Sequence, residues 1–487
     1  MQMKMKKIFI LLIVVVATAI ASCKKLEDLN VNEKAATKVP SETLFTNAIR
    51  GLADQMTTPS NNFNVLRLFS QYWAATTYPD ETRYDILSRP IPGNEFTALY
   101  RDVLSDLKEC KRVVESETSV ISTAAEKKNK AAIADIMTIY TFQRLVDIFG
   151  NIPYEEALDA NNISPAYDDA QSIYAKLFAR LDGAIAALDA SAGSFGSADL
   201  IYGGDAGKWK LFANSLKVRM AITVADVSGL DPAGKINSAV SSGIFKSDAD
   251  AAAFPYLKDP PNTNPVWTNI VSADRKDWVA SNTLVDLMNS LSDPRRSKYF
   301  LPNIKDSGGN PIYVGGIYGD LNDYASYTQL TTTILAPDRA ALFLDYTEIQ
   351  FYLAEAAARG FIGGSAETYY NEAIKSSGKA WGVSDADIAT YLAKKEVAYS
   401  TADGTFKEKI ARQAWIAYFD RGQIAWTTWR RLDAPKFNPP KNMTNADIPV
   451  RYIYPPTEQT LNNKNYTAAA AAIGGDAKST KLFWDKF

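Results

Sequence analysis

The sequence predicts an all-α fold that is built from tetratricopeptide-like helix pairs and interrupted by one loop-rich insertion. Two observations support this prediction. Apolar residues recur at the spacing of a helix with one buried face over most of 41–247 and again over 346–431. Between about residues 248 and 338, Pro, Asn, Asp and Gly become frequent and helical periodicity is scarce.

In the first half of the chain, capping residues and apolar spacing indicate a series of helices. The first predicted helix has Asn94 as its N-cap and carries the apolar stripe Leu99, Val103, Leu107, Cys110 and Val114. The second covers 131–149 and is ended by Gly150, and the third starts at Asp168 and carries Ile173 to Leu188. The fourth covers 209–224, and the fifth is capped by Asp231 and ends at Gly243. The position of Cys110 on the stripe predicts a buried small hydrophobe.

In the second half, one short helix is expected inside the insertion, from Ser281 to Leu291. The helical stretch 346–431 contains Leu353-Ala354 and then the pattern Ala366-x3-Tyr370-x2-Ala373. Small residues at these positions let two helices approach closely, as in a tetratricopeptide pair. The tail beyond is irregular, and 451–454 is its one short strand candidate.

Residues 1–22 have the pattern of an export signal peptide, in which lysines precede an apolar run too short to span a bilayer as a mature helix. The run ends in Ile20-Ala21-Ser22-Cys23, which resembles the cleavage box of bacterial lipoproteins. We therefore expect Cys23 to become the first residue and to carry palmitate-type acyl chains that hold the protein on the membrane. An ordinary secretory signal with a chance cysteine is the alternative. Residues 23–40 are then a lipidated tether, and 41–487 form a single helical domain.

Composition excludes several classes of protein. The chain has no histidine, which excludes Ser-His-Asp and Cys-His nucleophile systems and HExxH zinc sites. The 53 basic and 55 acidic residues give no electrostatic footprint for nucleic acid, and the basic run at Lys127, Lys128 and Lys130 is expected to be a solvated helix start. No cofactor or metal is indicated, because the calcium-like stretch 28–39 lacks the Gly and Glu of a calcium loop. Structural calcium elsewhere is left open.

A series of short motifs resembles the SusD/RagB-like family, whose members are nutrient-binding outer-membrane lipoproteins of Bacteroidota. The resemblance covers nearly the whole chain after the cysteine. The motifs, in order, are Asp28-Leu29-Asn30-Val31-Asn32; Tyr72-Trp73 leading into 78–84 (YPDETRY); 147–154 (DIFGNIPY); 209–217 (WKLFANSLK); 353–360 (LAEAAARG); Trp426-x-x-Trp429-Arg430-Arg431; and Asn465-Tyr466 with 483–486 (FWDK).

This resemblance implies an all-α superhelical scaffold of tetratricopeptide-like pairs with a loop-rich ligand face. It also implies a protein that is not an enzyme. Family members sit on a SusC-like TonB-dependent transporter of the outer membrane, face the cell exterior, and capture a glycan or a peptide for import. A glycan ligand, the transporter and the membrane, reached through the lipid anchor, are therefore the expected partners.

Candidate ligand-binding residues are aromatic and planar polar side chains in irregular segments. A sugar offers an apolar face for stacking and a rim of hydroxyls for Asn, Asp and Arg. Two regions qualify, and the resemblance places the ligand face in the same two parts of the chain. The candidates are Trp73, Tyr78, Asp80, Arg83 and Tyr84 in the first region, and Trp267, Trp278, Tyr313, Tyr318, Asp320, Asn322 and Tyr324 in the insertion.

Three other functions stay open on the sequence. A RagB-like peptide binder would use backbone hydrogen bonds in a deeper cleft, although aromatic loops favour sugar. An all-helical glycoside hydrolase needs only two carboxylates, but no acidic pair is singled out by its context. A purely structural helical-repeat adaptor would bind no small ligand at all.

Overall fold

The computed structural model describes residues 39–487, in which Ser41–Phe487 packs as one unit. The predicted signal peptide, Cys23 and most of the tether lie outside the described residues. The predicted all-α class is confirmed, because helices form the body of this unit and its strands occur only in short two-stranded pairs. No helix within residues 39–487 has the length and apolar character needed to cross a bilayer.

The elements have the following bounds. The longer helices are α2 (Ser41–Thr57), α5 (Ser105–Ser116), α6 (Ala124–Phe149), α7 (Ala170–Ala187), α8 (Ala206–Thr223), α9 (Pro232–Ser242), α10 (Asn282–Leu291), α12 (Tyr346–Ala358), α13 (Ala366–Ala380), α14 (Asp385–Leu392), α15 (Phe406–Ala417), α16 (Gly422–Leu432) and α18 (Asn463–Ala472). The short helices are α3 (Leu66–Phe69), α4 (Ile91–Thr97), α11 (Arg296–Tyr299) and α17 (Pro456–Leu461). The strands are β1 (Trp73–Ala75), β2 (Ala252–Phe254), β3 (Trp278–Ala280), β4 (Ile304–Lys305), β5 (Pro311–Ile312) and β6 (Ala341–Leu344).

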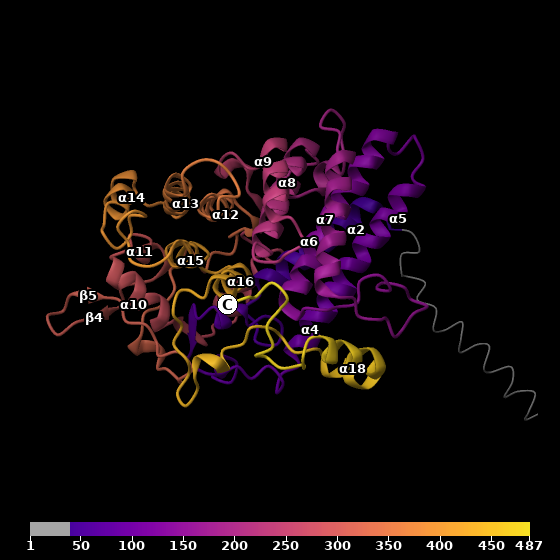
Figure 1. The fold of residues 1–487 in the computed structure, drawn as a ribbon. Coiled ribbons are helices and arrows are strands. Elements are labelled where there is room, and N and C mark those ends of the chain that lie inside the picture. The colour runs from indigo at the N-terminus through magenta and orange to yellow at the C-terminus, as the bar shows by residue number, and fades with distance from the viewer. Residues whose placement is uncertain (1–38) are drawn as a thin grey trace, which may run out of the picture. The chain divides into compact units, whose positions relative to one another are not determined.

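The long helices stack side by side, from α5 through α6, α7, α8 and α12 to α13 and α14 (Figure 1). The central helices α6 and α8 are covered on nearly every side, and almost all of their residues beyond the first turns are buried, charged ones such as Arg144 and Arg219 included. A capping box fixes the start of α6, since the Thr123 hydroxyl accepts from the Glu126 N–H and the Glu126 carboxylate accepts from the Thr123 N–H. Helix α6 therefore begins seven residues before the predicted stretch.

The predicted tetratricopeptide-like pair is α12 and α13. Ala354, Tyr370 and Ala373 are buried where the two helices pack, and the chain turns between them at Gly360 and Gly364. The apolar stripe from Leu99 to Val114 is buried as predicted, with Cys110 among its fully buried residues. Burial raises the pKa of the Cys110 thiol to about 12, which leaves it inert as a nucleophile.

Two of the predicted helix starts are wrong by a few residues. Helix α4 begins at Ile91, with Pro92 in its first turn, and Asn94 lies inside it with its amide bonded to the Asn62 carbonyl. Asp169 rather than Asp168 caps α7, because the Asp168 carboxylate instead accepts from two backbone N–H groups at Tyr154 and Glu155. The cap predicted at Asp231 is confirmed, and the short helix predicted from Ser281 to Leu291 is observed as α10, with Ser281 as its N-cap.

Two other predictions are corrected. Residues 451–454 form no strand, because Tyr452 N–H donates to the Ile148 carbonyl at the end of α6 and Arg451 binds Asp476 at 2.6 Å. Lys130 is not solvated, since it is 3% exposed and its ammonium lies 2.5 Å from Glu42 and 3.1 Å from Glu117. The spacing of charges along one helix does not reveal a carboxylate that a different helix supplies.

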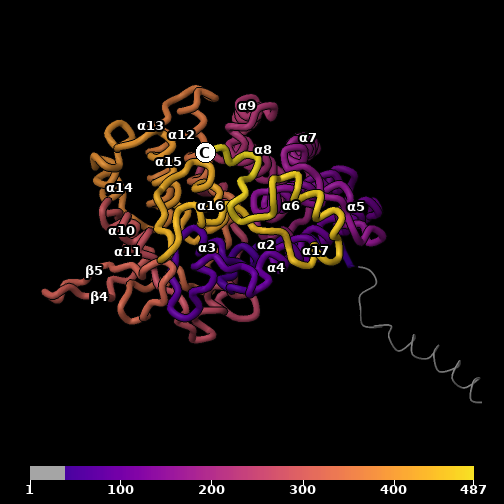
Figure 2. Tube along the Cα trace, turned by 60° about the horizontal axis from the view of Figure 1, so that its bottom comes forward, coloured from indigo at the N-terminus to yellow at the C-terminus, as the bar shows by residue number. Residues whose placement is uncertain are grey.

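The insertion and the segment after α2 gather beside the helical layer, where the indigo and rose traces meet at the bottom of Figure 2. Strands β1 and β3 pair antiparallel there, and β2 pairs with β6. The hairpin β4–β5 projects away from the body in both views (Figures 1 and 2). Two strands of the insertion, β2 and β3, therefore pair with segments outside it, whereas β4 and β5 pair with each other.

Buried arginine–carboxylate pairs join these parts. The Arg67 side chain is 4% exposed; its Nε donates to Asp420, which precedes α16, and its Nη atoms donate to the carbonyls of Thr57 and Thr58. Although burial alone would raise it, the pKa of Asp420 is held below its ordinary value by the guanidiniums of Arg67 and Arg339. The core is thus held by buried ion pairs as well as by apolar packing.

Replacing Arg67 with Ala should lower the free energy of unfolding by about 3 kcal/mol or more, because carbonyls and a carboxylate lose their buried partner. Urea denaturation followed by circular dichroism measures this change. The control is Arg101→Ala, whose pair with Asp102 is solvent-exposed and should leave the midpoint unchanged. Equal midpoints for Arg67→Ala and the wild type would contradict this view of the core.

The burial of Asp485 predicts that the free energy of unfolding depends on pH. Its carboxylate oxygens are buried without a hydrogen-bond partner in residues 39–487, and burial raises its pKa to about 6. A raised carboxyl pKa means that the folded state favours the protonated form, so this contribution to stability falls as pH rises from about 4 through 6. Asp485→Asn should therefore be more stable than the wild type at pH 8, by up to about 3 kcal/mol, and equal to it near pH 4.

Asp447 is the matched control for Asp485, because its pKa is shifted in the opposite direction. The Thr444 backbone N–H lowers the pKa of Asp447, so Asp447→Asn should lose stability at pH 8 instead of gaining it. Thermal unfolding of both variants across pH 4–8 separates the two cases. A stability gain at pH 8 in both variants, or in neither, would show that burial of Asp485 is not the cause.

Candidate functional site

The β1–β3 pair brings the two predicted ligand regions together. Trp73 lies opposite Ala280 and Ala75 opposite Trp278, and beyond the strands the Thr76 N–H donates to the Asp277 carbonyl at 2.9 Å. Strands in this pairing place their ends within a few ångströms of each other. The loop that follows β1 and the loop that precedes β3 therefore face one shared space.

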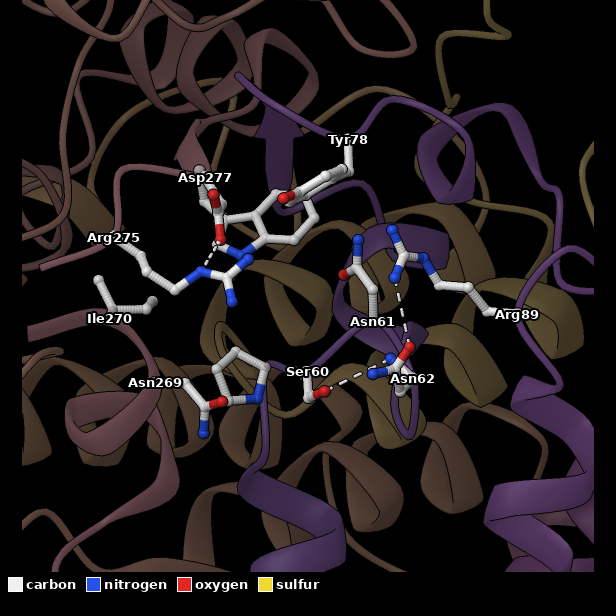
Figure 3. A pocket seen from close by; sticks show the side chains of 11 residues that line it. Ser60, Asn61, Asn62, Tyr78, Arg89, Asn269, Ile270, Arg275 and Asp277 are labelled. Carbon is white, nitrogen blue, oxygen red and sulfur yellow. Dashed lines mark hydrogen bonds and ion pairs between the residues drawn. The ribbon is translucent and has the colours of Figure 1, made fainter. Parts of the chain in front are cut away.

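That space is an open pocket of about 200 Å³, named here the Tyr78 pocket. Figure 3 shows its polar side chains arranged around a central space beneath the Tyr78 ring. Three segments supply the lining: the loop after α2, the loop after β1, and the stretch that leads into β3. The residues are Pro59, Ser60, Asn61, Asn62, Tyr78, Arg89, Asn269, Ile270, Arg275, Asp277 and Trp278.

Tyr78 is the exposed aromatic residue of the pocket, with 39% of its surface open to solvent. Two guanidinium groups flank it, with Arg89 Cζ 5.2 Å and Arg275 Cζ 5.8 Å from the ring centroid. Cation–π attraction at these distances fixes the ring without removing it from solvent. Trp278 is mostly buried and packs against Trp73 at 6.2 Å, so it forms a rigid wall.

Each arginine of the pocket has its own carboxylate partner. Arg275 Nε lies 2.5 Å from Asp277 Oδ2, and Arg89 Nε lies 2.6 Å from Glu81 Oε1. Glu81 is buried behind the pocket, and this burial raises its pKa above the ordinary value. The second carboxylate oxygen of Glu81 accepts a hydrogen bond from Asn61 Nδ2 at 2.7 Å. The charges therefore balance, and the pocket presents fixed polar groups without an excess charge.

A π-helical turn, Trp267–Ser272, positions the wall opposite Tyr78. Here the turn is closed by Arg275 N–H donating to the Ile270 carbonyl at 2.8 Å, and Asn269 Nδ2 donates to the Pro265 carbonyl. The turn thereby directs Asn269 and Ile270 toward the pocket, as Figure 3 shows.

The pocket also has a free acceptor. Asn61 Oδ1 is buried and has no hydrogen-bond partner in the part of the chain that the structure describes. Such unsatisfied buried atoms are few in native proteins, and a ligand hydroxyl would reach this enclosed oxygen once the Asn61 side chain turns toward the pocket. No group of three or more acidic or cysteine residues within 39–487 is arranged to hold a metal ion. The chemistry on offer is stacking against Tyr78 and hydrogen bonding to planar amide, carboxylate and guanidinium groups.

Two of the predicted ligand residues, Tyr78 and Trp278, line this pocket. Other predicted residues are exposed or half-buried but lie outside its lining: Asp80, Arg83, Trp267, Tyr313, Asp320 and Tyr324. Of these, Arg83 donates to the Gly319 carbonyl at 2.7 Å, and Tyr313 lies under the Arg296 guanidinium.

The other four predicted residues are enclosed: Trp73, Tyr84, Tyr318 and Asn322. The Tyr318 hydroxyl donates to the Leu68 carbonyl, and the Tyr84 hydroxyl accepts from Gln71. The Asn322 amide donates to two carbonyls of its own loop and to the Ala75 carbonyl on β1. Because these side chains pack the loops onto the body, the structure corrects their assignment to an exposed ligand face.

Sequence reasoning missed most of the polar lining: Asn61, Asn62, Arg89, Asn269, Arg275 and Asp277. Two of them carried a usable signal, since Arg275 and Asp277 directly precede the predicted Trp278. Asn61 and Asn62 follow the end of α2, where a polar run has an ordinary explanation as a helix terminator.

Larger cavities exist elsewhere, of about 500 Å³ beside Trp381 and about 470 Å³ beside Trp429. Size alone does not select a site for a polymer, whose chain extends beyond any one pocket. The Tyr78 pocket combines an exposed aromatic ring with planar polar groups from loops, and it joins the two regions that the sequence singles out.

Comparisons with known proteins support the resemblance. Residues 32–455 match the SusD-like family described as "Starch-binding associating with outer membrane". Among solved structures, a chitin-binding protein, whose organism is not named, is 26% identical with TM-score 0.79, covering 92% of this chain and 100% of its own. A chitin-binding SusD homolog from Flavobacterium johnsoniae is 24% identical with TM-score 0.77, covering 91% of this chain and 99% of its own. A SusD homolog from Bacteroides uniformis is 24% identical with TM-score 0.74, also covering 91% of this chain and 99% of its own. No curated protein matches the chain. The family match covers most of the sequence, and the chain therefore belongs to the SusD-like family.

Proposed function

We propose that the protein is a lipid-anchored outer-membrane lipoprotein that binds a glycan in the Tyr78 pocket and delivers it to a SusC-like TonB-dependent transporter. The observation that carries the ligand class is the pairing of an exposed tyrosine with amide and guanidinium groups around it. Family membership supports the outer-membrane setting, and two similar structures are described as chitin-binding.

Capture without bond breaking fits the charges of the pocket. Glycoside hydrolysis requires two carboxylates that flank the scissile bond. Asp277 is the one acidic residue in the lining, and it is paired with Arg275. Glu81 is turned toward Arg89 and Asn61 from behind the wall. These contacts support a binding role over the hydrolase.

The pocket volume supports recognition of a few rings within a longer chain. Sites that enclose a drug-sized ligand measure roughly 300–1,000 Å³, whereas this pocket is smaller and open. One or two sugar rings would be held and the rest would stay in solvent. Weak single sites of this kind gain strength when a polymer engages many copies on a cell surface.

Replacing Tyr78 with Ala should weaken glycan binding by roughly tenfold, since the stacking surface is lost. Affinity electrophoresis through gels with starch, soluble chitin derivatives and other polysaccharides identifies the ligand, and calorimetry with its oligosaccharide measures the loss. The control is Tyr313→Ala, a half-buried tyrosine outside the lining, which should bind as the wild type does. Uniform mobility on every polysaccharide, with binding of extended peptides instead, would replace the glycan proposal with the peptide one.

Replacing Cys23 with Ala should release the protein from the membrane, because no acyl chain would be attached. Metabolic labelling with palmitate, followed by fractionation, measures the change. The buried Cys110 is the internal control, and Cys110→Ala should keep both the label and the membrane fraction. Label retained after Cys23→Ala would refute lipidation at that residue.

A further inference from the structure

The cavity of about 500 Å³ lies apart from the Tyr78 pocket, and no residue lines both. It is bounded by the segment around β6 and by the C-terminal ends of α13 and α15. Its walls include two arginines, Arg339 and Arg421, two aromatic rings, Trp381 and Phe419, and small apolar side chains such as Leu342. A smaller cavity shares both arginines on the other side of the segment 339–342.

The ion-pair network that reaches this cavity through Arg339, Arg421 and Asp345 carries an excess of one positive charge. Each carboxylate is shared between arginines or bound to one: Asp420 binds Arg67 and Arg339, Glu348 binds Arg219 and Arg421, and Asp345 binds Arg421. Four guanidiniums therefore face three carboxylates. In a partly buried setting an unbalanced charge is costly unless a counter-ion joins it.

The Arg421 guanidinium has spare donors. Its side chain is 11% exposed, and its Nε and Nη1 have no hydrogen-bond partner among residues 39–487. Nη1 lies 3.1 Å from Asp345 Oδ1 as an ion pair, but not in the orientation of a hydrogen bond. Both donor atoms are enclosed, so an occupant of the cavity would meet Arg421 as a fixed positive charge rather than through these two N–H groups.

Arg339 presents its guanidinium to the same cavity. Its Nη1 atom is bound to Asp420, and its Cζ atom lies 5.3 Å from the centre of the Trp381 ring. Two arginines that each keep a fixed carboxylate are held in place, and the donors of Arg339 outside its pair with Asp420 suit the planar fork of a further carboxylate. The aromatic and aliphatic walls are unsuited to a fully hydrated inorganic anion and suit an apolar ring face.

We propose that this cavity is a second binding site, which takes an organic monocarboxylate whose carboxylate is bound by Arg339 beside the positive charge of Arg421 and whose ring-sized body rests against Trp381 and Phe419. The shared chemistry is a carboxylate on a six-membered ring. Its source is either an acidic sugar or a free apolar acid. This site does not depend on the function of the Tyr78 pocket.

Calorimetry on the full chain in detergent tests the site, with sodium glucuronate, sodium cyclohexanecarboxylate and neutral glucose as probes. At least one carboxylate should bind at one site per chain and more tightly than glucose. Tighter binding of glucuronate identifies an acidic sugar, and tighter binding of cyclohexanecarboxylate identifies a free acid. Arg339→Gln should weaken the carboxylate by roughly tenfold or more, because a charge-assisted hydrogen bond is lost.

Matched variants separate this site from the first one. Arg339→Gln should keep wild-type glycan affinity, and Tyr78→Ala should keep wild-type carboxylate affinity. Trp381→Leu, which removes an aromatic wall and keeps every arginine and carboxylate of the ion pairs, covers the case in which Arg339→Gln does not fold. The proposal is overturned if neither carboxylate binds, or if binding is the same in the wild type and in every folded variant of Arg339 and Trp381.

Discussion

The contact between Arg67 and Asp420 holds the ligand loops against the helical layer. Arg67 lies on α3, directly before β1, and Asp420 lies between α15 and α16. The guanidinium also binds the carbonyls where α2 ends, and it lies 5.3 Å from the centre of the Trp73 ring. One side chain thus fixes the start of the loop that carries Asn61, the strand that precedes Tyr78, and the helix beneath both.

The backbone must approach closely for this contact to form. A Cβ atom at Gly422 would lie within 2.5 Å of the backbone of Leu66 and Arg67, so only glycine fits where α16 begins beside α3. The Ser70 hydroxyl donates to the Gly422 carbonyl at 2.7 Å across the same junction. Substitution at Gly422 would push α16 away and separate Asp420 from Arg67.

The sequence was sufficient to predict the main helices and to identify the two regions of the chain that meet at the pocket. Helical period is a local property, and it located α6, α7, α8 and the α12–α13 pair because each buries one or more faces along its own length. The loop aromatics were found by composition. Their roles were not, since Tyr78 and Tyr318 are both tyrosines in glycine- and proline-containing loops, yet one is 39% exposed and the other 2%.

That difference is decided by contacts between residues far apart in the sequence. Tyr318 is buried because its hydroxyl reaches a carbonyl at Leu68, 250 residues away, and its ring packs against Tyr84. Asn61 belongs to the site because Glu81 holds its amide and leaves its oxygen free. No local pattern contains such information, so apart from Arg275 and Asp277, which lie next to Trp278 in the sequence, the polar lining could only be seen once β1 and β3 were paired.

The two cavities differ in charge, and this difference gives them different ligands. In the Tyr78 pocket Arg89 and Arg275 each bind a separate carboxylate, so their remaining donors act as neutral hydrogen-bonding groups toward hydroxyls. Around Trp381, four guanidiniums share three carboxylates, and a neutral sugar would leave that excess uncompensated. Arginine beside an aromatic ring is thus compatible with either ligand class, and the count of partner carboxylates decides between them.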